Sequence, residues 1–238
     1  MALKPEARGR IRSEPAIKLI NVSTYYSGET KPAIRDVSLE ILSGDLVLIS
    51  GPNGSGKTTL LETILGLLKP RKGEVLLLGH EIPREAILAR KYCSYLPQDF
   101  MKPAGEPFSV KEVVAMGLSP LRPLGRLGPN DWEAVYEVLD LLGVKDMAER
   151  PFGRLSGGQQ QKVMIARALV RKPKVLFLDE PFSALDKEAR AFLSEEVLPE
   201  LVRRETTVLL VSHDIAFKPS VCNKTVHMKD GKIVKVEE

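Results

Sequence analysis

The chain has 238 residues, of which 43% are hydrophobic and 28% are charged, and its formal net charge is +4. This length allows one large domain or one domain with a subdomain, and the composition is that of a soluble globular protein with a sizeable core. No apolar run approaches the roughly 20 residues of a membrane helix, and no basic stripe interleaved with aromatic residues indicates a nucleic-acid surface.

The N-terminal segment 1–15 is basic, with Lys4, Arg8, Arg10 and Arg12 against two glutamates. It lacks an apolar core, so it is not a secretory signal. We interpret it as a solvated, disordered tail, with weak contact to anionic lipid as the alternative. The two cysteines have no metal-binding spacing, which is typical of reduced thiols in a cytosolic protein.

Residues 17–24 and 33–41 both alternate in part between apolar and polar side chains. With the turn around Gly28, they predict a β-hairpin or neighbouring antiparallel strands. Tyr25 and Tyr26 follow the first strand. An exposed aromatic ring at this place could stack on an adenine, or pack on the sheet, and spacing alone leaves both interpretations open.

A glycine-rich loop follows the apolar run 46–49 and precedes a helix-like segment, 60–68. Strand, loop and helix are the context that the G-x-x-x-x-G-K-[ST] motif requires. Backbone N–H groups and the helix N-terminus then converge on a polyphosphate. We predict that Lys57 reaches the β- and γ-phosphates and that the Thr58 hydroxyl ligates Mg²⁺. The loop residues are Gly51, Pro52, Asn53, Gly54, Ser55, Gly56, Lys57, Thr58 and Thr59.

The middle of the chain changes in character. After a turn at Gly73, residues 74–78 and 93–96 read as strands, the second of which is followed by Pro97 and Gln98. Prolines and glycines then surround a helical segment at 110–116, and an amphipathic helix is predicted over 131–142. We therefore expect a mainly helical subdomain, roughly 99–165, inserted in an α/β core.

Ser156 is a favourable N-cap for a long helix that runs to residue 170. Gly157 and Gly158 follow it and leave the helix N-terminus open to an anion. An ordinary capped helix is the alternative interpretation, because Ser-Gly-Gly is also common in loops.

Two short apolar runs, 175–178 and 208–211, read as buried parallel strands. The first ends in Asp179 and Glu180, at the sheet edge where open α/β folds bind ligands. We expect Asp179 to hold Mg²⁺ and Glu180 to polarise the attacking water, although acidic residues also favour first helical turns. His213 ends the second strand and could contact a γ-phosphate or be structural. A hairpin with an Asp-Gly turn closes the chain.

Together these motifs resemble the nucleotide-binding subunit of an ATP-binding cassette (ABC) transporter, over about residues 16–236. The family's order is Walker A (51–59), Q-loop (Gln98), LSGGQ signature (155–159), Walker B (175–180) and switch histidine (His213), and residues 183–186 match the D-loop. The signature separates this family from other P-loop ATPases. The resemblance implies an α/β fold: a P-loop NTPase (RecA-like) core with an antiparallel β subdomain and an inserted helical subdomain.

The resemblance also implies an active ATPase that uses ATP and Mg²⁺. Glu180 would be the general base and His213 the γ-phosphate sensor, while Gln98 would contact Mg²⁺ and link the nucleotide to the helical subdomain. By the same analogy, Tyr26 stacks on adenine. In a head-to-tail homodimer, ATP held by one subunit would contact residues of the other, namely Ser156, Gly157, Gly158, Gln159 and Asp186. One departure is Lys162, where arginine is more usual.

The implied partners are integral membrane permease subunits, which place the chain at the cytoplasmic face of the cell membrane, and an extracytoplasmic solute-binding protein. Segment 109–127 resembles importers of metal ions and metal chelates, so we expect zinc or manganese as cargo, or else an iron-siderophore or cobalamin. Soluble ABC ATPases are the alternative. The stretch from Gln98 to Ser156 is too short for the coiled coil of repair and chromosome proteins, and translation factors carry two cassettes. A single-cassette ATPase of iron–sulfur cluster assembly stays open.

Overall fold

The computed structural model describes residues 15–98, 108–213 and 218–238. The predicted tail therefore lies outside the described residues except for Pro15, and so do residues 99–107 of the expected helical subdomain. Among the described residues, no helix is both long enough and apolar enough to cross a membrane.

A four-stranded antiparallel sheet has the order β2-β1-β4-β5. Its strands are β1 (Pro15–Thr24), β2 (Ile34–Leu42), β4 (Pro70–Leu77) and β5 (His80–Ile82). β1 pairs with both β2 and β4, which confirms the antiparallel pair predicted near the N-terminus. Gly73 was predicted to be a turn before a strand, and this is wrong. It lies inside β4, where its φ of 83° and the carbonyls of residues 20 and 21 leave no room for a side chain.

The second sheet has six strands in the order β10-β9-β3-β8-β7-β6. They are β3 (Leu46–Ser50), β6 (Cys93–Leu96), β7 (Val175–Asp179), β8 (Thr207–Ser212), β9 (Lys224–Lys229) and β10 (Lys232–Glu237). β3, β6, β7 and β8 run parallel to their neighbours, and the closing hairpin β9–β10 is antiparallel, as predicted.

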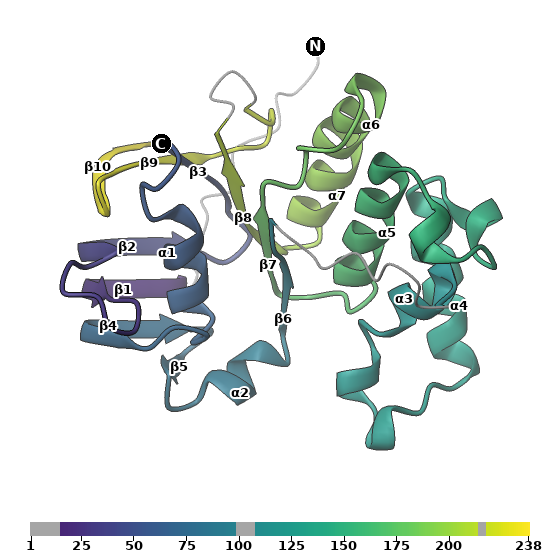
Figure 1. Cartoon of the computed structure of the whole chain (residues 1–238), viewed down its shortest axis with the longest axis horizontal. Helices are drawn as coiled ribbons and strands as arrows, with labels where there is room; N and C mark the ends of the chain where they lie inside the picture. Colours follow the sequence, from purple (N-terminus) through teal and green to yellow (C-terminus); the bar gives the residue numbers. More distant parts are fainter. Residues whose placement is uncertain (1–14, 99–107, 214–217) are drawn as a thin grey trace, which may run out of the picture.

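The helices occupy both faces of this sheet. They are α1 (Lys57–Ile64), α2 (Ala86–Arg90), α3 (Val110–Ala115), α4 (Pro129–Leu141), α5 (Gly157–Leu169), α6 (Lys187–Phe192) and α7 (Leu198–Arg203), with a π-helical turn, Leu193–Val197, joining the last two. Short 3₁₀ turns lie at Ser119–Leu121, Pro123–Gly125, Lys145–Met147 and Phe152–Arg154. In Figure 1 the antiparallel sheet and α1 lie on one side of the six-stranded sheet, and α3 to α7 lie on the other.

The central strands are apolar along their whole length because both faces are buried. Leu176 and Leu178 of β7 belong to the hydrophobic cluster formed with α3 to α7. Val175 and Phe177, which alternate with them, belong to the cluster formed with α1 and the antiparallel sheet. This arrangement explains the continuous apolar runs of the sequence.

α1, α2, α6 and α7 differ from the sequence-based prediction, and α2 was not predicted at all. α1 begins at Lys57, before the predicted start at residue 60, and ends at Ile64, because Gly66 adopts a left-handed conformation with φ 67° that ends the helix. The helical run from Lys187 to Arg203 was not predicted at all. Its signals were Asp186 as an N-cap and apolar residues at helical spacing, namely Ala189, Leu193, Val197 and Leu201.

Candidate nucleotide-binding site

The loop between β3 and α1 is built from glycines whose conformations other residues rarely adopt. Gly51, Gly54 and Gly56 have φ values of 148°, 76° and 96°. A Cβ atom on Gly51 would lie 2.2 Å from the Met228 carbonyl oxygen, so β9 packs directly on the loop. The sequence therefore needs glycine here for a close backbone approach as well as for the turn.

Lys57 and Thr58 begin α1 at the mouth of this loop. The Lys57 Nζ donates hydrogen bonds to the carbonyl oxygens of Gly51 at 2.8 Å and Pro52 at 3.1 Å. An ammonium group has three donors, so Lys57 is held over the loop and one donor remains for a phosphate. The Thr58 Oγ1 donates to the Asp179 Oδ2 at 2.6 Å, which joins α1 to the end of β7.

The carboxyl ends of β7 and β8 bring Glu180 and His213 together. β7 and β8 are neighbours in the sheet, and the Glu180 Oε2 lies 2.8 Å from the His213 Nδ1. Glu180 is 7% exposed and its φ is 51°, a strained conformation for a non-glycine residue. Its backbone N–H donates to the Val211 carbonyl at 3.1 Å, which fixes the carboxylate at the sheet edge.

A cleft of about 310 Å³ is lined by most of the residues predicted to bind the nucleotide, but not by Gly51, Pro52, Ser55 or His213. Its lining residues are Tyr26, Ala33, Asn53, Gly54, Gly56, Lys57, Thr58, Thr59, Gln98, Asp179 and Glu180. The structure places Tyr26 in the cleft, where its hydroxyl lies 2.9 Å from the Thr59 Oγ1. Tyr25 instead stacks on Arg71, whose guanidinium carbon is 5.1 Å from the ring centre. Of the two tyrosines that the sequence left open, Tyr26 is the one that lines the cleft.

Two residues beside the cleft were missed by sequence reasoning. Burial raises the pKa of the Glu62 carboxyl, and the negative charge of Asp179 raises it further. Burial also raises the pKa of the Tyr95 hydroxyl, with Asp179 and Glu62 adding to the shift. Glu62 lies one helical turn after Thr58 on α1, and this spacing was the signal available in the sequence.

The signature residues do not line this cleft. The Ser156 Oγ accepts a hydrogen bond from the Gln159 N–H at 3.3 Å and the Gln159 Oε1 accepts one from the Ser156 N–H at 3.0 Å, which caps α5. A Cβ on Gly157 would meet nothing within 4 Å, so this part of the helix N-terminus is open. Asp186 caps α6 by accepting from the Ala189 N–H at 2.8 Å. Within the single chain, these residues and the phosphate loop are separate.

The residues present fit a nucleotide with Mg²⁺. The buried Ser55 Oγ has no hydrogen-bond partner among the described residues, which fits a further contact to a ligand in the loop. Mg²⁺ is usually held by one or two protein oxygens together with substrate phosphates and water. The Thr58 hydroxyl and the Asp179 carboxylate supply two such oxygens next to the phosphate loop.

Comparison with known proteins identifies the family. A model of the ABC transporter family matches residues 34–183. The chain belongs to the ABC transporter ATP-binding cassettes. As an ABC cassette it is an ATP-binding and ATP-hydrolysing protein, with the P-loop fold, antiparallel β subdomain and helical subdomain that the resemblance implied. This confirms the fold class and the ATPase activity predicted from sequence.

Three curated relatives of this ABC cassette are transport proteins. The Bacillus subtilis manganese transport system ATP-binding protein is 37% identical over 206 residues, which cover 84% of this chain and 77% of the relative. The Listeria innocua zinc uptake system ATP-binding protein is 37% identical over 88% of this chain and 81% of its own length. The Vibrio cholerae Fe(3+) ions import ATP-binding protein is 36% identical over 92% of this chain, but the chain spans only 60% of that relative.

Solved structures of other ABC cassettes have the same fold. One is a dimeric, post-hydrolysis cassette bound to ADP and phosphate, with a TM-score of 0.82, 31% identity and coverage of 93% of this chain and 98% of that chain. Another is an inward-facing, putative metal-chelate type ABC transporter, with a TM-score of 0.78, 28% identity and coverage of 94% of this chain and 83% of that chain.

Proposed function

We propose that this ABC ATPase powers the uptake of a metal ion or a metal chelate, with zinc or manganese as the first choice and an iron-siderophore or cobalamin as the second. The observation that carries the proposal is the identity of about 37% to manganese and zinc transport ATPases over more than four fifths of the chain. The segment 109–127, which includes α3 and the loop after it, supports the same cargo class.

The proposed reaction is hydrolysis of the γ-phosphate of ATP in the cleft between α1 and the end of β7. Lys57 binds the β- and γ-phosphates, and Thr58 and Asp179 hold Mg²⁺ with the assistance of Gln98. Bound Mg²⁺ neutralises charge on the phosphate oxygens. Glu180 takes a proton from the attacking water. His213, which is hydrogen-bonded to Glu180 in the chain without nucleotide, is the proposed contact of the γ-phosphate.

We also propose that two copies of the chain bind ATP head to tail. The open N-terminus of α5 supports this arrangement, because its N–H groups and the partial positive charge of the helix end favour an anion. The signature residues 156–159 and Asp186 lie outside the chain's own nucleotide cleft. A second copy would bring them to the opposite side of its partner's ATP.

The proposed membrane partners are permease subunits that bind the helical subdomain at the cytoplasmic face of the cell membrane, with an extracytoplasmic solute-binding protein delivering the cargo. The alternative function is a soluble cassette of iron–sulfur cluster assembly. Affinity purification of the tagged chain from detergent-solubilised membranes separates the two, since a polytopic membrane protein accompanies only a transporter subunit.

Metal uptake by cells tests the cargo directly. Deletion of the gene should lower accumulation of one metal, measured with radioactive zinc and manganese in separate assays. Wild-type protein should restore accumulation, whereas Glu180→Gln should not. Unchanged accumulation of zinc, manganese, iron-siderophore and cobalamin in the deletion strain would refute the metal cargo, and purified ATPase activity would stand unaffected.

A further inference from the structure

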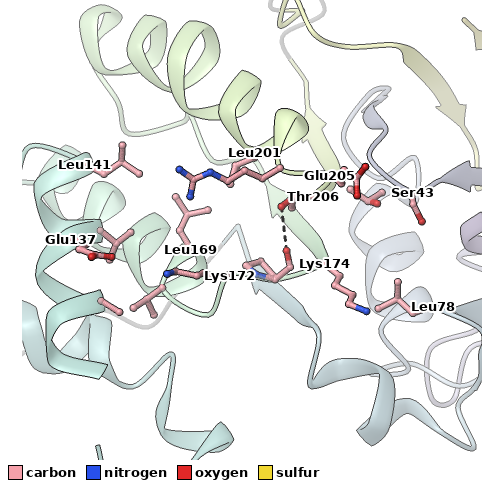
Figure 2. Close-up of a pocket in the computed structure, with 16 residues that line it drawn as sticks. Ser43, Leu78, Glu137, Leu141, Leu169, Lys172, Lys174, Leu201, Glu205 and Thr206 are labelled. Carbon is pink, nitrogen blue, oxygen red and sulfur yellow. Dashed lines mark hydrogen bonds between the residues drawn. The ribbon is translucent and has the colours of Figure 1, made fainter. Parts of the chain in front are cut away.

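A second cavity, of about 660 Å³, lies at the other end of the parallel strands from the nucleotide cleft. It is lined by residues just before β7 and β8, by one face of α4, and by Ser43 and Leu78 from the turns of the antiparallel sheet (Figure 2). Cavities of roughly 300–1,000 Å³ with an apolar lining and a few polar groups are typical ligand sites. No role described so far uses this cavity.

Apolar side chains of three helices form the floor of the cavity. Val138 and Leu141 come from α4, Leu169 from α5 and Leu201 from α7. Leu141 lines the cavity and is 49% exposed. Because burial of apolar surface is favourable, this floor favours a ligand with an apolar body.

The base of the cavity is fixed by hydrogen bonds between loops. The Thr206 Oγ1 donates to the Pro173 carbonyl at 3.3 Å, which is the dashed line in Figure 2. The Thr207 N–H donates to the Lys174 carbonyl at 2.9 Å, and the Gly44 N–H donates to the Thr207 Oγ1 at 3.0 Å. The cavity is therefore preformed in the chain without a ligand.

Among the described residues, three charged side chains at the rim lack partners, namely Glu137, Lys172 and Glu205. The opposite charges of Glu137 and Lys172 carry the argument below. Glu137 comes from α4 and Lys172 from the loop after α5 (Figure 2). Neither has an ion pair or a side-chain hydrogen bond with the described residues. Other rim cations are engaged: Lys174 lies 5.1 Å from the Tyr92 ring centre, and the Arg204 Nε donates to the Glu200 Oε1 at 2.7 Å.

The backbone gives independent support. Lys172 follows α5 and Glu205 follows α7, with φ values of 49° and 61°. At such helix ends glycine is usual because other residues are strained. The chain carries instead two long charged side chains, and both residues line the cavity. Strained residues of this kind gather at ligand sites.

We propose that this cavity binds a small zwitterion with an apolar body, such as a short apolar peptide. Its ammonium group pairs with Glu137, its carboxylate pairs with Lys172, and its side chains cover the leucines of the floor. A simple anion would leave Glu137 unpaired beside it, and a simple cation would do the same to Lys172. A ligand that carries both charges pairs with both Glu137 and Lys172.

The test is calorimetric titration of the full chain with three peptides that differ in one charge each: leucyl-leucine, N-acetyl-leucyl-leucine and leucyl-leucine amide. We expect leucyl-leucine to bind best and each capped peptide to bind about fivefold more weakly, the effect of one exposed ion pair. Absence of binding at millimolar peptide, or equal binding of all three, would overturn the proposal.

Variants assign each charge. Glu137→Gln should remove the difference in affinity between leucyl-leucine and its N-acetyl form. Glu133→Gln, one turn earlier on the same helix, should preserve that difference. Lys172→Gly should remove the difference in affinity between leucyl-leucine and leucyl-leucine amide. It should keep or raise thermal stability, because glycine adopts a positive φ without strain. A Lys172→Gly protein that still discriminates against the amide would refute the assignment of the carboxylate.

Discussion

Glu180 combines burial, a left-handed backbone and a hydrogen bond to His213, and its proposed role is that of general base. Glu180→Gln keeps the shape of the side chain but cannot accept a proton. We expect ATP binding to be retained and hydrolysis to fall by a factor of about 10² to 10⁴, the usual contribution of a general base. Steady-state phosphate release and fluorescent-nucleotide binding measure the two effects. Normal turnover in the variant would remove Glu180 from this role.

Glu62 gives a pH-dependent prediction. Burial and the charge of Asp179 raise the pKa of its carboxyl in the folded chain. Below the unfolded pKa, about 4.3, the group is protonated in both states and has no effect. As pH rises through the folded pKa, the folded state is penalised relative to the unfolded state. We therefore expect Glu62→Gln to have a higher melting temperature than wild type at pH 7.5, with the difference shrinking toward pH 4.5.

Glu133→Gln is the control for the loss of one carboxylate, because Glu133 is exposed on α4. A melting difference for Glu62→Gln that is the same at both pH values would show that packing, and not ionisation, separates the variant from wild type.

At the scale of single residues, sequence motifs located the phosphate loop and the ends of β7 and β8 because their spacing is set by local backbone geometry. The choice between Tyr25 and Tyr26 could not be made in this way. It depends on the position of Arg71, which lies on β4 and stacks on the Tyr25 ring. The pKa shifts of Glu62 and Tyr95 likewise depend on burial in the assembled fold.

At the scale of elements, the N-terminus of α5 offers a matched pair of variants. Ser156 caps α5 and Ser109 caps α3, each within a capping box. Loss of either cap should cost about 1 kcal/mol of stability. If α5 faces the ATP of a second copy, Ser156→Arg should reduce ATP turnover strongly while the monomer still binds ATP. Ser109→Arg should reduce stability by a similar amount but leave ATP turnover unchanged. ATP binding abolished in the Ser156→Arg monomer would contradict the contact between copies.

Helix boundaries show where prediction from sequence stops. α5 and α4 were predicted closely, because Ser156 caps α5 and a long apolar period marks α4. The helical run from Lys187 to Arg203 was missed. Its apolar face packs on the cluster around β7 and β8, and a π-helical turn, Leu193–Val197, interrupts the regular period. α1 was misplaced because its first turn is also part of the phosphate loop.

At the scale of the whole molecule, the fold class was predictable because several motifs occur in a fixed order around one sheet. The layer arrangement follows from strands that are apolar on both faces. The order β3-β8-β7-β6, in which strands distant in sequence are neighbours, was not predicted. No local pattern encodes which strand pairs with which.

The proposed assembly is tested by sedimentation of Glu180→Gln. With ATP and Mg²⁺ the variant should shift from monomer to dimer, because bound nucleotide is not consumed; with ADP it should stay monomeric. The double variant Glu180→Gln with Ser156→Arg should bind ATP and remain monomeric. Tight ATP binding without any dimer in Glu180→Gln would mean that membrane subunits must hold the two copies together.

β7 joins the two ends of the molecule. It begins directly after Lys174, which lines the second cavity, and ends at Asp179 in the nucleotide cleft. Its five residues span about 17 Å, and neighbours on both sides hold it in register, so it cannot stretch. Whatever free energy links the two ends is reciprocal. A molecule held at the beginning of β7 changes the affinity for ATP by the same factor as ATP changes the affinity for that molecule, so either site can be titrated to measure the other.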